Sequence, residues 1–163
     1  MTIDEKFMRL ALKEADKAQQ IDEVPIGAVL VKDGKVIARG HNKRETTNDP
    51  TGHAEIIVIK KACKKLQSWR LVDVTLYVTI EPCLMCSGVI IQSRIKKVVF
   101  GARDFKGGAF GSSINVLESE NINHYPTVIS GVLEKECSEK VSSFFKNIVT
   151  FISFPPNISE FFK

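Results

Sequence analysis

The 163-residue sequence lacks a long hydrophobic run, and this absence excludes one class of protein at once. No apolar stretch approaches the roughly 20 residues that a membrane-spanning helix needs. Residues 1–6 also lack the basic segment and the apolar stretch of a signal peptide. We therefore expect no membrane association and a cytoplasmic location. Internal repeats and low-complexity segments are missing as well, which predicts one domain over residues 1–163.

Cysteine is scarce, with four residues in the chain. In a cytoplasmic protein, cysteines serve as free thiols or metal ligands more often than as disulfides. Charge of one sign is also not in large excess, because 23 Lys and Arg against 19 Asp and Glu leave a net charge of +4. Such a small surplus is only mild support for an anionic partner, since the needs of solubility account for it equally well.

The hydrophobic pattern predicts alternating helices and strands. Residues 4–19 have the apolar spacing of an amphipathic helix. Strands over 26–32 and 35–41 flank Asp33-Gly34, a pair that suits a tight hairpin turn because both residues tolerate positive φ. Further elements are expected as follows: a helix from near His53, a strand over 75–79, a short helix from Pro82, strands over 97–101 and 128–131, and a helix over 133–149. The order predicts an α/β domain whose mixed sheet is covered on both faces and contains one parallel crossover.

Two short motifs carry the chemistry. Residues 53–55 read His-Ala-Glu, and residues 82–86 read Pro-Cys-Leu-Met-Cys. Cys83 and Cys86 stand three apart, so on one helical turn their sulfurs face the same way, and a helix N-terminus favours the thiolate that binds metal. With His53 they offer three zinc ligands. Three protein ligands and an open position for water are typical of catalytic zinc sites, whereas structural sites are closed by four.

The combined H-x-E and P-C-x-x-C pattern is the established signature of zinc-dependent nucleobase deaminases. In that chemistry a zinc-activated hydroxide attacks the carbon that carries an exocyclic amine. Glu55 would take the water's proton, pass it to the ring nitrogen and then protonate the departing amine. Positions i and i+2 do not share a face of a regular helix. His53 and Glu55 can therefore serve one site only if His53 lies at the irregular start of its helix.

A structural zinc site is the alternative interpretation, and it needs a fourth ligand. Cys63 is too far from His53 along a continuous helix to share its metal. Cys137, His41 and His124 stay open as candidates at this point, although Cys63 and Cys137 are expected as core thiols and His124 as a loop residue.

Further segments extend the two motifs. Asn42 is one, and the others are residues 23–29 (Glu-Val-Pro-Ile-Gly-Ala-Val), 49–55 (Asp-Pro-Thr-Gly-His-Ala-Glu), 75–86 (Thr-Leu-Tyr-Val-Thr-Ile-Glu-Pro-Cys-Leu-Met-Cys), 93–95 (Ser-Arg-Ile) and 98–104 (Val-Val-Phe-Gly-Ala-Arg-Asp). On these segments the sequence resembles the bacterial tRNA adenosine deaminases, which convert the wobble adenosine of an anticodon to inosine. The resemblance runs from about Glu14 to Lys146.

This resemblance implies a cytidine-deaminase-like fold, which is a three-layer α/β/α sandwich with a five-stranded mixed sheet. It implies a homodimer with each active site near the interface, one zinc ion per subunit and a tRNA anticodon stem-loop as substrate, with arginine tRNA expected. The implied roles are base binding by Asn42, pocket shaping by Val24, Pro25 and Ile26, and anticodon contacts by Asp104 and Lys106. Phe105, Phe144 and Phe145 are candidates for stacking on flanking bases, with ordinary packing as the alternative for each.

The C-terminal segment departs from the family pattern. Relatives often end in a basic helix that helps to hold RNA, whereas residues 147–163 are apolar and phenylalanine-rich beyond a core of about 3–146. Pro155-Pro156 is expected to end the last helix. Two competing functions also stay open. One is a deaminase of free adenosine, guanine or cytosine, and the other is a catalytically silent RNA-binding subunit with structural zinc.

Overall fold

The computed structural model describes residues 1–152, with side chains as far as residue 148. Its elements follow the expected order, and they are α1 (Ile3–Gln20), β1 (Gly27–Lys32), β2 (Lys35–His41), α2 (Ala54–Leu66), β3 (Val74–Ile80), α3 (Leu84–Gln92), β4 (Lys97–Ala102), the 3₁₀ turn η1 (Val116–Glu118), β5 (Thr127–Ile129) and α4 (Glu134–Ile152). No helix within residues 1–152 combines the length and the apolar character that crossing a membrane would require.

The five strands form one mixed sheet in the order β2-β1-β3-β4-β5. Strand β1 is antiparallel to both β2 and β3, whereas β3, β4 and β5 are mutually parallel. All strands except β1 therefore end at the same edge of the sheet. In register, Leu30 pairs with Leu76 and Leu76 with Val98. The carboxyl edge shared by four strands is where open α/β sheets usually bind ligands.

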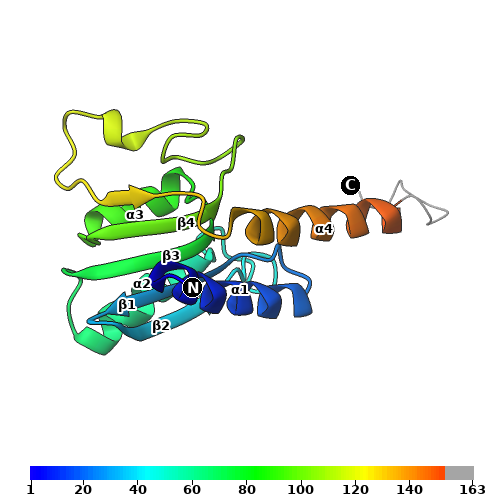
Figure 1. Cartoon of the computed structure of the whole chain (residues 1–163), viewed down its shortest axis with the longest axis horizontal. Coiled ribbons are helices and arrows are strands. Elements are labelled where there is room, and N and C mark those ends of the chain that lie inside the picture. Colours follow the sequence, from blue (N-terminus) through cyan, green and yellow to red (C-terminus); the bar gives the residue numbers. More distant parts are fainter. Residues whose placement is uncertain (153–163) are drawn as a thin grey trace.

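Helices cover both faces of the sheet, so the predicted three-layer α/β/α sandwich is confirmed (Figure 1). Helices α1 and α4 are in contact on one side of the sheet, and α4 extends beyond the edge of the sheet in this view. Alternate strand residues supply the two cores: Leu30 faces α2 and α3, and Val29 faces α1. Helix α1 packs directly on β1 because Gly27 has no side chain. A Cβ there would lie 2.1 Å from the Ala11 carbonyl oxygen.

Local sequence signals account for most element ends. Asp33 and Gly34 have φ values of 51° and 74°, as a type I′ hairpin turn requires. Helix α1 starts with a capping box in which Thr2 and Glu5 bond each other's backbone N–H groups.

Three expected boundaries were wrong by two residues or more, and one is the end of the strand expected over 128–131, which spans Thr127–Ile129 as β5. The helix expected from Pro82 begins at Leu84, because Cys83 is extended and bridges to Gly108, while the Pro82 carbonyl oxygen accepts from the Ala109 N–H. The last helix continues past residue 149 as far as Ile152. Pro155-Pro156, expected to end it, and the rest of the apolar tail lie outside the described residues.

Candidate active site

A cavity of about 620 Å³ opens at the carboxyl edge of the sheet. Its walls come from the segment before β1, the loops after β2, β3 and β4, the start of α2 and one side of α4. Because β1 runs opposite to its neighbours, its N-terminal end lies at the same edge as their C-terminal ends. Topology thus brings segments that are far apart in the sequence to one place.

The three predicted metal ligands meet beside this cavity: His53 and Cys83 line it, and Cys86 is buried next to them. His53 Nδ1 lies 3.6 Å from Cys83 Sγ and 3.5 Å from Cys86 Sγ, and one ligand atom from each residue lies within 4.8 Å of the others. His53 is the N-cap of α2 and Cys83 the N-cap of α3, both with extended backbone. Two helix N-termini therefore present one group that can hold a metal ion.

The group has three members in the described part of the chain. The candidates for a fourth ligand are placed elsewhere. The ring of His41 bonds Glu14, and His124 Nε2 lies 2.6 Å from the Ile95 carbonyl oxygen. Cys137 is buried in the core beside α1. A closed, four-ligand structural site therefore finds no support among these residues.

The pKa values of the Cys83 and Cys86 thiols are shifted in opposite directions. Hydrogen bonding from Cys86, reinforced by His53, lowers the pKa of Cys83 to about 4. Hydrogen bonding to Cys83 and burial raise the pKa of Cys86 well above its ordinary value. Because the Cys86 thiol donates its hydrogen bond to the Cys83 thiolate, the pair resists losing both protons. A bound cation favours the loss of both. The pair is therefore suited to a divalent metal.

Glu55 lies in the same cavity, inside the first turn of α2, and only 4% of it is exposed. Burial raises the pKa of its carboxyl group. A buried carboxyl group with a raised pKa can hold a proton near neutral pH and release it to a neighbour. Glu55 therefore has the setting of an acid–base group.

Asn42 lines the same cavity as the predicted metal ligands His53 and Cys83. Its Nδ2 donates to the Val24 carbonyl oxygen at 3.3 Å, and its Oδ1 accepts from the Arg44 N–H at 3.1 Å. These bonds fix the orientation of the amide and leave one N–H and one lone pair for a ligand. Val24 and Ile26 also line the cavity, whereas Pro25, expected to shape it with them, is buried and does not line it.

The loop after β4 forms another wall, to which Asp104, Phe105 and Lys106 contribute. Phe105 is 75% exposed. Phe145 of α4 reaches the cavity and is half exposed, whereas Phe144 packs edge-to-face against Phe145 and does not line the cavity. Both aromatic groups at the mouth are therefore available to a planar ligand.

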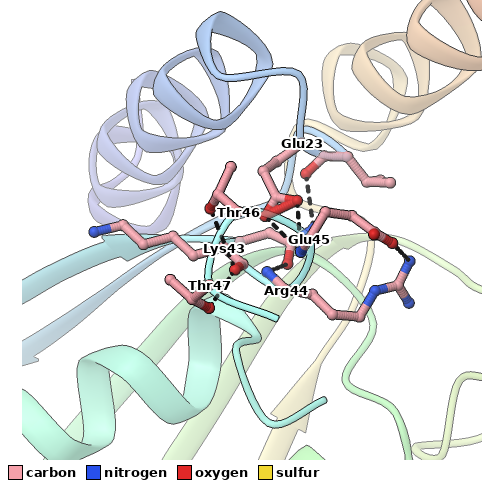
Figure 2. A network of polar contacts seen from close by, with 8 residues as sticks. Glu23, Lys43, Arg44, Glu45, Thr46 and Thr47 are labelled. Carbon is pink, nitrogen blue, oxygen red and sulfur yellow. Dashed lines mark hydrogen bonds and ion pairs between the residues drawn. The ribbon is translucent and has the colours of Figure 1, made fainter. Parts of the chain in front are cut away.

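Sequence reasoning missed the buried Glu23 behind one wall. Its carboxylate accepts the Glu45 N–H at 2.8 Å, as Figure 2 shows. The hydroxyl groups of Thr46 and Thr47 donate to the Lys43 carbonyl oxygen in the same loop. Glu23 thus fixes the loop that follows Asn42. A charged residue directly before the apolar stretch that leads into β1 was the available signal.

Other contributors were missed as well. The carboxylate of Glu81 is buried and bonded to the loop after β4. Arg44 and Arg103 add cationic groups to the lining. Ser138, Val141 and Ser142 of α4 complete one wall, and nothing in their sequence context indicates this position.

Comparison with known proteins agrees with this geometry. Residues 3–146 match the family model described as MafB19-like deaminase. The tRNA-specific adenosine deaminase of Bacillus subtilis (strain 168) is 55% identical over 91% of this chain and 92% of its own length. The corresponding Haemophilus influenzae protein is 51% identical over 88% of this chain and 83% of its own. A solved structure from a study of A-to-I editing by tRNA:A34 deaminases at the wobble position superposes with a TM-score of 0.81. It is 50% identical and covers 83% of this chain and 98% of its own.

Proposed function

We propose, from the premise that this chain belongs to the tRNA-specific adenosine deaminases, that it hydrolyses the wobble adenosine of a tRNA anticodon loop to inosine and ammonia. It is then a hydrolase acting on the C–N bond of a cyclic amidine, and an arginine tRNA is the proposed substrate. The observation that carries the proposal is the meeting of His53, Cys83 and Cys86 in one group beside a cavity that the buried Glu55 also lines.

Zinc is the metal that we propose for this site, one ion per subunit. Bonds of about 2.3 Å to sulfur and about 2.05 Å to nitrogen, at tetrahedral angles, would separate nitrogen and sulfur by about 3.6 Å. The separations of 3.5 and 3.6 Å between His53 Nδ1 and the two sulfurs support that fit. Zinc held there would supply the Lewis acidity that makes water a nucleophile near neutral pH.

Glu55 moves the protons in the proposed reaction. It accepts one from the attacking water and delivers it to N1 of adenine as the C6–O bond forms. It then takes the proton of the new hydroxyl group on C6 and delivers it to the exocyclic nitrogen, so that the C6–N bond breaks, ammonia leaves and the C6 carbonyl group of inosine forms. One carboxyl group can perform both tasks because they occur in sequence. Its burial supports this role, since a raised pKa makes the protonated form accessible.

Asn42 would hold the base with its remaining donor and acceptor, beside Val24 and Ile26. A wobble base is single-stranded and can be splayed into a pocket at modest unstacking cost. The cations Arg44, Arg103 and Lys106 around the cavity suit phosphates of the flanking nucleotides. Phe105 and Phe145 are the proposed stacking groups, with Asp104 as a further anticodon contact. These features favour an RNA loop over a free base.

We also propose a homodimer in the cytoplasm, with each active site near the interface and one domain over residues 1–163. Several apolar side chains stand at least half exposed and are available to a partner subunit, among them Trp69, Val72 and Leu84. Sedimentation of the purified protein tests the assembly.

The decisive experiment incubates purified, zinc-loaded protein with an adenosine-wobble arginine anticodon stem-loop and measures inosine. Free adenosine, guanine and cytosine are assayed alongside. We expect inosine in the RNA alone. Ammonia from a free base, without inosine in the RNA, would show that the substrate is a free base and not tRNA. The proposed deamination chemistry would still hold. No reaction with any substrate would favour a silent RNA-binding subunit.

A further inference from the structure

The loop after β4 lies directly on the turn that carries the first cysteine ligand. The Ala109 N–H donates to the Pro82 carbonyl oxygen at 2.9 Å, and Cys83 and Gly108 form an antiparallel bridge. Residues that line the substrate side of the cavity and residues that hold the metal are therefore in contact through their backbones.

Glu81 adds a buried carboxylate to this junction, with 3% of the residue exposed. Oε1 accepts from the Asp104 N–H at 3.3 Å and from the Ser112 hydroxyl group. Oε2 accepts from the Phe110 N–H at 3.0 Å and from the Ser112 N–H at 3.2 Å. Four donors from the loop after β4 thus converge on one side chain of the turn before Cys83.

The Asp104 end of this network shapes the substrate wall. Asp104 Oδ1 accepts from the N–H groups of Lys106 and Gly107, and its carbonyl oxygen accepts from the Gly108 N–H at 2.8 Å. These bonds close a turn that displays Phe105 and Lys106 at the cavity. Since the Asp104 N–H is tied to Glu81, the position of this turn relative to Cys83 depends on the carboxylate.

The loop after β4 and the turn before Cys83 approach each other most closely at Gly108. A Cβ at this position would lie 2.4 Å from Glu81 Oε2 and 2.5 Å from the Asp104 carbonyl oxygen. The neighbouring Gly107 has room, with Asp104 Oδ2 at 3.4 Å as the nearest atom. Contact with Glu81 therefore requires glycine at residue 108 and not at residue 107.

We propose that Glu81 is a positioning residue that sets substrate affinity: it holds the turn at 104–106 at a fixed place relative to the metal-binding turn. This inference rests on the proposed function, because the loop after β4 is the proposed contact for nucleotides that flank the wobble base. Glu81 itself does not touch the reacting atoms in this scheme.

Glu81→Gln is the first test, because glutamine keeps the shape and has a single acceptor. With its oxygen in the place of Oε2, it still accepts from Phe110 and Ser112. Its amide nitrogen can donate to the Ser112 hydroxyl group, which then acts as acceptor. The Asp104 N–H is the donor that loses its partner. Hydrogen exchange measured by NMR should therefore accelerate about tenfold or more at the Asp104 amide.

Kinetics on the anticodon stem-loop give the second readout. We expect Glu81→Gln to raise KM about tenfold, equivalent to about 1.4 kcal/mol, with kcat and metal content close to wild type. Gly108→Ala should do the same by a steric route. The matched control is Gly107→Ala, which leaves the Asp104 bond to Glu81 in place and should keep wild-type KM.

Several outcomes would overturn the proposal. Unchanged exchange at Asp104 in Glu81→Gln would show that the carboxylate does not hold the turn. Loss of metal would assign Glu81 to the metal-binding turn alone, and a lower melting temperature with unchanged KM would assign it a purely structural role. Failure of the proposed function is distinguishable, because the wild-type protein would then produce no inosine in the stem-loop.

Discussion

His53 and Glu55 stand two residues apart and line the same cavity, although residues at this spacing diverge on a regular helix. The backbone of His53 is extended, with ψ of 148°, and the residue caps a helix that begins at Ala54. Glu55 lies inside the first turn of that helix. The helix boundary therefore falls between the proposed ligand and the proposed acid, and both side chains reach one cavity.

Glu55→Gln should abolish turnover without loss of metal. The amide keeps the shape of the side chain but cannot accept and release the proton, and acid–base groups typically contribute about 10²–10⁴-fold to rate. Inosine formation and metal content per chain are the measurements. Glu139→Gln, at an exposed position on α4, is the charge-matched control and should retain activity. Retained turnover in Glu55→Gln would show that Glu55 is not the group that transfers the protons.

Cys83→Ser should lose both metal and deaminase activity, because a hydroxyl group is a far poorer zinc ligand than a thiolate. Cys63→Ser is the matched control, since Cys63 lies outside the ligand group in α2. Chelation of the wild-type protein should likewise stop turnover, and added zinc should restore it. Full metal content in Cys83→Ser would contradict the ligand assignment.

Asn42→Asp should lower kcat/KM on the stem-loop by about 10- to 100-fold, the usual range for a buried polar group left without its partner. The new carboxylate would face the Val24 carbonyl oxygen, to which Asn42 Nδ2 now donates. Asn48→Asp makes the same chemical change at an exposed position of the same loop and should be nearly silent. Equal kinetics for the two variants would show that Asn42 does not hold the base.

Glu14 should make stability depend on pH. Burial alone would raise the pKa of its carboxyl group, but bonds to Lys17 and His41 outweigh burial and lower the pKa below 4.5. A lowered pKa stabilises the fold above the ordinary value, and this contribution disappears as pH falls through the lowered value.

Glu14→Gln should therefore lower the free energy of unfolding by about 1 kcal/mol at pH 7. The difference from wild type should shrink towards pH 3. Urea unfolding at both pH values measures it. Glu139→Gln, which removes one partner of an exposed ion pair with Lys135, should change little at either pH. A difference in the free energy of unfolding that grows on acidification would show that the pKa of Glu14 is raised in the folded state and not lowered.

Elements set by neighbouring residues were predictable. The hairpin turn at Asp33-Gly34 follows from the backbone freedom of those two residues, and strands β3 and β4 from their β-branched and aromatic content. The start of α3 was not predictable. Proline tolerates a first helical turn, so Pro82 suited one, but its carbonyl oxygen and Cys83 are engaged by Gly108 and Ala109. A long-range contact overrode a local preference.

The sequence by itself determined the chemistry that we propose for this protein, because the residue types and spacings within His53–Glu55 and Cys83–Cys86 are local properties. Only the tertiary structure decided what surrounds that chemistry. The bonds from Glu23 to Glu45 and from Glu81 to Asp104 join segments that are distant in the chain, and Phe145 reaches the cavity only because α4 packs beside the sheet. Such pairings depend on which loops close and which surfaces pack, and no short sequence pattern encodes them.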